Sequence, residues 1–65
     1  MPALTIKPLL VGVPEAAMIL GIGRSTLYLL VKQGELHPIH IGRATRFTMA
    51  ELESYVDRRA KIDAT

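Results

Sequence analysis

The amino-acid sequence predicts a small, mainly helical domain with one β-hairpin, and three observations support this fold class. Apolar residues recur at helical spacing in three segments, 13–20, 24–32 and 49–56. Residues 37–47 instead alternate polar and apolar side chains around a glycine-containing turn, which is typical of a hairpin. The chain has 65 residues and no cysteine, so we expect one domain without disulfide bonds.

The first helix is expected to begin after Gly12 and to end at Gly21. Gly12 is an acceptable N-cap, and Pro14 in the first turn lacks only an N–H group that would be unpaired there. Gly21 is the usual type of residue at a helix C-terminus. The apolar run 9–11 before this helix predicts either a brief strand or a lead-in to the helix.

The second helix is expected to run from Arg24 to about Lys32, with Gly34 near its C-terminal cap. Successive residues of a helix are about 100° apart, which separates an inner stripe from an outer face. The inner stripe consists of Leu27, Leu30 and Val31. The outer face consists of Ser25, Leu29 and Lys32, with Tyr28 and Arg24 to one side.

The hairpin is expected to consist of a strand at 37–41, a turn at 42–44 and a returning strand at 45–47. Pro38 lacks an N–H group and confines the first strand to an edge or a strand start. The side chains expected to face the core are Ile39, Ile41 and Phe47. The side chains expected to point outward are His40, Arg43 and Arg46.

The third helix is expected to start with a capping box, in which Thr48 and Glu51 satisfy each other's backbone N–H groups. Its apolar face consists of Met49, Leu52, Tyr55 and Val56. Cations near its C-terminal end suit the helix dipole, and these are Arg58, Arg59 and Lys61. We therefore expect a loose arm at 1–8, a folded domain at 9–61 and a flexible tail at 62–65.

Several function classes are disfavoured by composition. The two histidines are three residues apart with no third ligand nearby, so we expect no metal. Paired carboxylates, Ser/His or Cys/His sets and a phosphate-cradling glycine loop are absent from the sequence, so we expect no enzyme, cofactor or small-molecule substrate. The sequence shows neither a membrane span nor a secretion signal, which indicates a cytoplasmic protein with no membrane partner.

The charge is unevenly distributed along the chain. The net charge is +2, but residues 24–48 carry four Arg and Lys against one Glu, whereas residues 1–23 are neutral. This basic middle segment contains the second helix and the hairpin. Two short helices joined by a three-residue turn predict a helix-turn-helix, and a hairpin behind them predicts a wing. Together they indicate a surface that binds double-stranded DNA.

Residues 9–56 resemble the winged helix-turn-helix of the excisionase and MerR-like family. The resemblance lies in Glu15-Ala16-Ala17, Leu20-Gly21-Ile22, Arg24-Ser25-Thr26-Leu27-Tyr28, Gly34-Glu35-Leu36, Ile41-Gly42-Arg43, Arg46-Phe47 and the run 51–56. It implies a recognition helix that contacts DNA through Arg24, Ser25, Thr26 and Tyr28, and a wing that contacts DNA through Arg43 and Arg46. Lys32 is expected to contact the DNA backbone. The sequence departs from the family at Gly12 and Gly23 (often Ser or Thr), Leu29 (commonly basic) and Thr45 (usually aromatic).

The resemblance implies an excisionase, that is, a recombination directionality factor. Such a protein binds and bends DNA at attachment sites and biases an integrase towards excision, so integrase and further copies of this chain are candidate partners. A small prophage or plasmid transcription regulator is an alternative with the same DNA-facing parts. A protein-interaction module that kept the winged fold is an alternative of another class. Leu29 is open to three interpretations: an isolated surface residue, a thymine contact or a contact with a partner chain.

Overall fold

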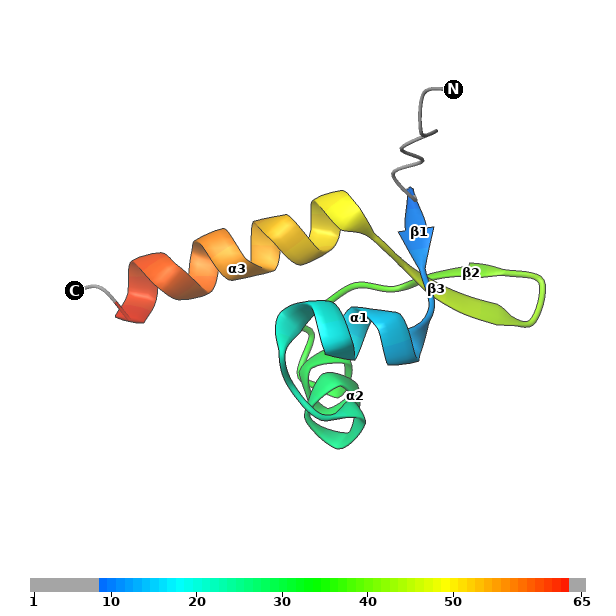
Figure 1. Ribbon diagram of the computed structural model, residues 1–65, viewed down its shortest axis with the longest axis horizontal. Coiled ribbons are helices and arrows are strands. Elements are labelled where there is room, and N and C mark those ends of the chain that lie inside the picture. Colours follow the sequence, from blue (N-terminus) through cyan, green and yellow to red (C-terminus); the bar gives the residue numbers. More distant parts are fainter. Residues whose placement is uncertain (1–8, 64–65) are drawn as a thin grey trace, which may run out of the picture.

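The structure is a computed structural model that describes residues 9–63. Its elements, in chain order, are β1 (Leu10–Val11), α1 (Val13–Leu20), α2 (Arg24–Lys32), β2 (Ile39–Ile41), β3 (Ala44–Thr48) and α3 (Met49–Asp63). The β2–β3 hairpin and α3 extend to opposite sides of the α1–α2 pair (Figure 1). This arrangement confirms the expected mainly helical, winged helix-turn-helix class.

Both ends of α1 follow from the glycines predicted to cap it. Gly12 is the N-cap in an extended conformation, and Pro14 lies in the first turn. Gly21 is the C-cap with φ 71°, a left-handed conformation in which a Cβ atom is unfavourable. Its N–H group donates to the carbonyl oxygen of Met18 at 3.1 Å, and the Ile22 N–H group donates to Ala17 at 3.0 Å. These bonds turn the chain sharply towards α2.

The start of α2 lacks a side-chain cap, because the N-cap is Gly23. The helix runs from Arg24 to Lys32 as predicted. Its last turn is closed by the Gln33 N–H group, which donates to the Leu29 carbonyl oxygen at 2.9 Å. Gly34 follows with φ 79° and lets the chain reverse towards β2.

The open question about residues 9–11 is resolved in favour of a strand. Leu10 and Val11 pair antiparallel with Thr48 and Phe47 of β3, so the sheet has the order β1-β3-β2. The central β3 therefore ties the N-terminal segment to the hairpin. β2 is an edge strand, as the proline before it predicted.

The expectation that Ile39 and Ile41 face the core is wrong. They pair with Arg46 and Ala44 of β3, and directly paired residues point to the same face of a sheet. Phe47 is adjacent to Arg46 in β3, so it points to the opposite face, where it is fully buried. Ile39 and Ile41 consequently remain 40% and 56% exposed on the outer face.

The N-terminus of α3 confirms half of the predicted capping box. The Glu51 N–H group donates to Thr48 Oγ1 at 2.9 Å. The Glu51 carboxylate, however, binds elsewhere: its Oε2 accepts from the His37 backbone N–H group at 3.2 Å and lies 3.1 Å from His37 Nδ1. The reciprocal half of the box is therefore replaced by a link to the segment between α2 and β2.

α3 extends to Asp63, two residues beyond the end at residue 61 that we expected for the domain. Residues 62 and 63 are thus helical, and residues 1–8 and 64–65 of the expected arm and tail lie outside the described residues. On the predicted apolar face, Leu52 is buried while Met49 and Tyr55 pack against the core. Val56 is 48% exposed, so it belongs to that face only in part.

The hydrophobic core lies where β1, β3 and the three helices meet. Its buried side chains come from every part of the described chain except β2. They are Val11, Ala16, Ala17, Leu27, Leu36, Phe47 and Leu52. The small Ala16 and Ala17 let α1 approach β3 and α2 closely, and this contact fixes the orientation of α2.

Candidate nucleic-acid interface

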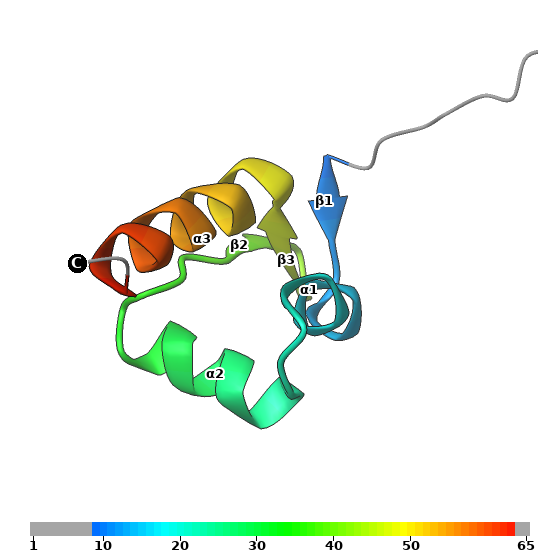
Figure 2. The same ribbon diagram turned by 60° about the vertical axis from the view of Figure 1, so that its left-hand side comes forward.

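The inner and outer faces of α2 are separated as the sequence predicted. Leu27 is fully buried, and Leu30 and Val31 pack against the core. The outer face is exposed, and Leu29 and Tyr28 retain 50% and 58% of their accessible surface. In Figure 2, α1 and α3 lie on one side of α2, and no other element of the described part of the chain covers its opposite side. The outer face of α2 is therefore accessible to a large partner.

The predicted contact residues of α2 do not all share this face. Ser25, Tyr28 and Lys32 lie on it, at spacings of three and four residues. Arg24 is exposed beside Tyr28 in the first turn. Thr26 is also exposed, but it lines an apolar groove of about 380 Å³ between α2 and α3, which the sequence did not indicate. Thr26 is thus separated from the other predicted contact residues.

The hairpin presents Arg43 at its tip. A two-residue loop, Gly42-Arg43, connects the paired residues Ile41 and Ala44. Gly42 has φ 59°, the positive value that the first loop position requires in a type II′ hairpin turn. Arg43 is exposed, as expected for a residue at the tip of a wing.

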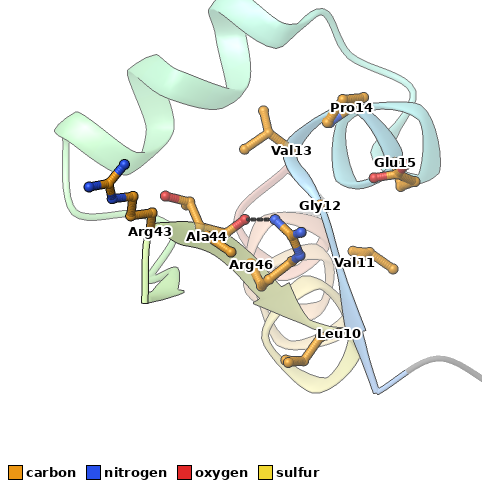
Figure 3. Close-up of a pocket in the computed structure, with 10 residues that line it drawn as sticks. Leu10, Val11, Gly12, Val13, Pro14, Glu15, Arg43, Ala44 and Arg46 are labelled. Carbon is orange, nitrogen blue, oxygen red and sulfur yellow. Dashed lines mark hydrogen bonds between the residues drawn. The ribbon is translucent and has the colours of Figure 1, made fainter. Parts of the chain in front are cut away.

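Arg46 is held more firmly than a free surface arginine. It is partly buried on the outer face of the sheet, and its Nη1 donates to the Thr45 carbonyl oxygen at 2.9 Å (Figure 3). Thr45, at the position where the family usually has an aromatic residue, is partly buried and its Oγ1 lies 3.2 Å from His40 Nδ1. This pair links the two strands of the hairpin in place of an aromatic contact.

Arg43 and Arg46 line the same open groove, of about 900 Å³, between the hairpin and residues 10–15 (Figure 3). Glu15, in the first turn of α1, lines the opposite wall. Its carboxylate lies in the first helical turn, where it interacts favourably with the positive end of the helix dipole. The groove therefore has basic groups on the hairpin side and one acidic group on the helix side.

Three cations of the basic middle segment differ in their contacts from two arginines of α3. Arg24, Lys32 and Arg43 make no side-chain hydrogen bond or ion pair within residues 9–63. In contrast, Arg59 pairs with Asp63 at 3.3 Å. Arg58 donates to Ser54 Oγ at 2.6 Å and to the Glu35 carbonyl oxygen at 3.1 Å. Arg24, Lys32 and Arg43 are therefore available to an external anion, whereas Arg58 and Arg59 of α3 are engaged.

Other types of site find little support in the described part of the chain. His, Asp and Glu side chains do not gather there in a group of three or more that would hold a metal ion. Within residues 9–63, the helices are also too short or too polar to span a bilayer. His37 anchors the loop before β2 to Glu51, and only the capping-box pattern at Glu51 marks this region in the sequence.

Comparison with known proteins agrees with this architecture. Residues 10–60 match the family described as a helix-turn-helix domain. The chain belongs to this helix-turn-helix family. Over 49 residues, or 75% of its length, the chain is also 41% identical to a Saccharopolyspora erythraea protein named "Probable excisionase". It spans about half the length of that relative, which aligns over 50% of its own chain. No solved structure matches the chain.

These matches confirm the resemblance to excisionases that the sequence motifs indicated. The matched range, 10–60, begins at β1 and includes both helices of the helix-turn-helix, the hairpin and most of α3. The helix-turn-helix family is not an enzyme class. The surface formed by α2 and the hairpin is therefore the candidate functional surface of this domain.

Proposed function

We propose that this helix-turn-helix domain binds double-stranded DNA sequence-specifically, with α2 in the major groove and the hairpin on the adjacent backbone. The observation that carries the proposal is the set of cations on α2 and the hairpin tip that have no partner among the described residues 9–63, namely Arg24, Lys32 and Arg43. Phosphate groups supply the missing partners, since most contacts between proteins and DNA are made to the backbone.

The base-facing contacts come from the outer face of α2. Ser25 and Tyr28 carry hydroxyl groups that donate or accept hydrogen bonds, and Arg24 adds a guanidinium group at the helix start. Gly23 leaves the N-terminal N–H groups of α2 without a side-chain cap, which favours a phosphate at that end. Thr26 lies in the same first turn but towards the groove between α2 and α3, so we assign it a contact with the DNA backbone beside this helix end rather than with the bases.

The hairpin contributes contacts of two kinds. Arg43 is exposed at the tip and reaches the backbone or a minor groove. Arg46 lies deeper and lines the groove beside Arg43. Because one of its nitrogens already donates to Thr45, we assign Arg46 a shorter-range backbone contact that also orders the hairpin.

We further propose that the protein acts as an excisionase, which binds and bends DNA beside an attachment site and biases an integrase towards excision. Its support is the 41% identity to a protein named as a probable excisionase. One short recognition helix and one hairpin make few phosphate contacts, so a single copy binds modestly. Neighbouring copies on DNA, or the integrase itself, then raise the occupancy.

Salt-dependent fluorescence polarisation tests the DNA-binding part. Each neutralised phosphate contributes about −0.9 to the slope of log K against log salt, so three to four contacts predict a slope of about −3. Arg43→Ala should reduce the magnitude of this slope by about 0.9. Arg59→Ala is the matched control, because it removes the same charge from a residue paired with Asp63. A flat slope, or equal effects of the two substitutions, contradicts the proposal.

An excision reaction reconstituted with the integrase and attachment sites from the same genome tests the second part. The excisionase should raise the yield of excised circle and lower that of integration. DNA binding without any effect on either reaction would favour the transcription regulator instead. Loss of a protein partner with unchanged DNA affinity in Leu29→Ala would favour an interaction module.

A further inference from the structure

The outer face of α2 has one apolar side chain among polar ones. Ser25, Tyr28, Leu29 and Lys32 follow one another at positions i, i+3, i+4 and i+7, and all four are exposed. This is the spacing with which a helix lying along the major groove presents successive side chains to the bases. Leu29 is 50% exposed, whereas Leu27 of the inner stripe is fully buried. Leu29 therefore contributes little to the core and occupies a position that faces the partner of α2.

We propose that Leu29 is a specificity-determining residue that selects a thymine by packing against its C5-methyl group in the major groove. This inference rests on the proposed function, because it requires α2 to lie in that groove. Thymine is the base that presents a methyl group there, whereas the corresponding edges of the other bases present hydrogen-bond donors and acceptors. The chemistry of the side chain thus matches one base better than the other three.

Exclusion of the other bases adds to this preference. A leucine side chain cannot bond with the amino group of cytosine or with O6 of guanine, so either group would lose water without gaining a partner. The neighbours of Leu29 on this face reinforce the preference. Ser25 lies four residues before Leu29 and Lys32 three residues after it, and both bind polar groups of the DNA, which fixes the position of the helix in the groove. No Asp or Glu occurs between residues 16 and 34, so α2 itself carries no carboxylate that would repel the DNA.

The experiment starts from the chain's own preferred duplex, selected from a random pool by the wild-type protein. Each thymine of that duplex is then replaced in turn by deoxyuridine, which removes the methyl group and keeps base pairing. We expect one thymine for each bound copy at which the replacement raises the wild-type Kd about fourfold. This factor corresponds to about 0.8 kcal/mol for one buried methyl group.

The variants identify the residue that senses the methyl group. In Leu29→Ala, the ratio of the Kd values for deoxyuridine and thymine at that position should fall to about one. Val56→Ala is the matched control, since Val56 is exposed to a similar extent on α3, and it should keep the fourfold ratio. Because each ratio compares two duplexes with the same protein, a change in the folded fraction cancels.

The proposal is overturned if the selected duplex has no methyl-sensitive thymine, or if Leu29→Ala keeps the fourfold ratio. It is also overturned if Leu29→Ala changes only the association between protein copies, which would make Leu29 a protein contact. Lack of DNA binding by the wild-type protein at any salt concentration would overturn the proposed function as well. Tight, salt-dependent binding without a methyl effect would overturn the role of Leu29 alone.

Discussion

The register of the hairpin makes a quantitative prediction about which isoleucines and valines stabilise the fold. Ile41 is 56% exposed on the outer face of the sheet, whereas Val11, which pairs with the buried Phe47, is only 7% exposed. Replacing each by threonine keeps the branched side chain suited to a strand and introduces one hydroxyl group. The two substitutions therefore differ in where that hydroxyl group lies and in the one additional carbon atom that Ile41→Thr removes.

The expected magnitudes follow from these exposures. Full burial of an isoleucine side chain stabilises a protein by about 1.5–3 kcal/mol, and less than half of Ile41 is buried. Since threonine keeps a methyl group, Ile41→Thr should lower the free energy of unfolding by about 0.5 kcal/mol. Val11→Thr places a hydroxyl group in the core, and this should cost about 1–3 kcal/mol.

Urea denaturation followed by circular dichroism measures both free energies. The slope of the unfolding free energy against urea should be unchanged in Ile41→Thr, because the folded structure is unchanged. A loss of 2 kcal/mol or more in Ile41→Thr, or similar losses in the two variants, would refute the register. Such a result would instead place Ile41 in the core, as the alternation of polar and apolar residues alone predicts.

Three further predictions concern caps, turns and the link from α3 to the loop. Thr48→Ala removes the hydroxyl group that accepts a hydrogen bond from the Glu51 N–H group. It should lower the free energy of unfolding by about 1 kcal/mol in the same urea titration. Gly42→Ala forces a Cβ atom into a backbone with φ 59°, so thermal unfolding should report a loss of about 1–2 kcal/mol, and no loss would contradict the turn geometry. Glu51→Ala removes the acceptor of both His37 contacts, and since the His37 side chain is largely exposed the cost should stay below about 1 kcal/mol. Amide hydrogen exchange should nevertheless become faster at the His37 N–H group, and unchanged exchange there would argue against the contact.

Both ends of α1 and the start of α3 were predictable from the sequence because single residues determine them. Gly21 ends α1 in a left-handed conformation that glycine adopts without steric cost, and Thr48 caps α3 with its own hydroxyl group. The inner stripe of α2 was also predictable, since a helix has a fixed angular period. Leu27 is buried at the position that this period assigns to it.

The sheet was harder to predict because strand pairing joins distant segments. Whether residues 10–11 form a strand depends on Thr48 and Phe47, which lie almost forty residues away in the chain. Likewise, the alternation at 39–41 indicates two faces and does not say which one is buried. Which face is buried depends on the pairing of Ile39 with Arg46. A shift of this pairing by one residue would move every side chain of the strand to the opposite face of the sheet.

The candidate DNA-binding residues were chosen by residue type and spacing. The sequence did not predict that they would lie on two different surfaces of the folded domain. Arg24, Ser25 and Thr26 are consecutive, so a one-dimensional pattern treats them alike. In the helix they diverge by about 100° each, which turns Thr26 towards the groove that it shares with Leu30 and Tyr55. Sequence reasoning could identify α2 as the candidate recognition helix but could not divide its first turn between two surfaces.

The small net charge of +2 underestimates the positive charge that α2 and the hairpin present to an anion. Of its eight Lys and Arg residues, Arg58 and Arg59 contact acidic groups of α3 itself, so those charges largely cancel locally. The acidic residues that lower the net charge are mostly on α3, and the screening length of about 8 Å at physiological salt limits their effect on α2 and the hairpin. A protein with the same composition but with Asp63 moved beside Arg24 would have the same net charge and a weaker affinity for DNA. The distribution of ion pairs, rather than the net charge, is therefore the electrostatic property that supports DNA binding.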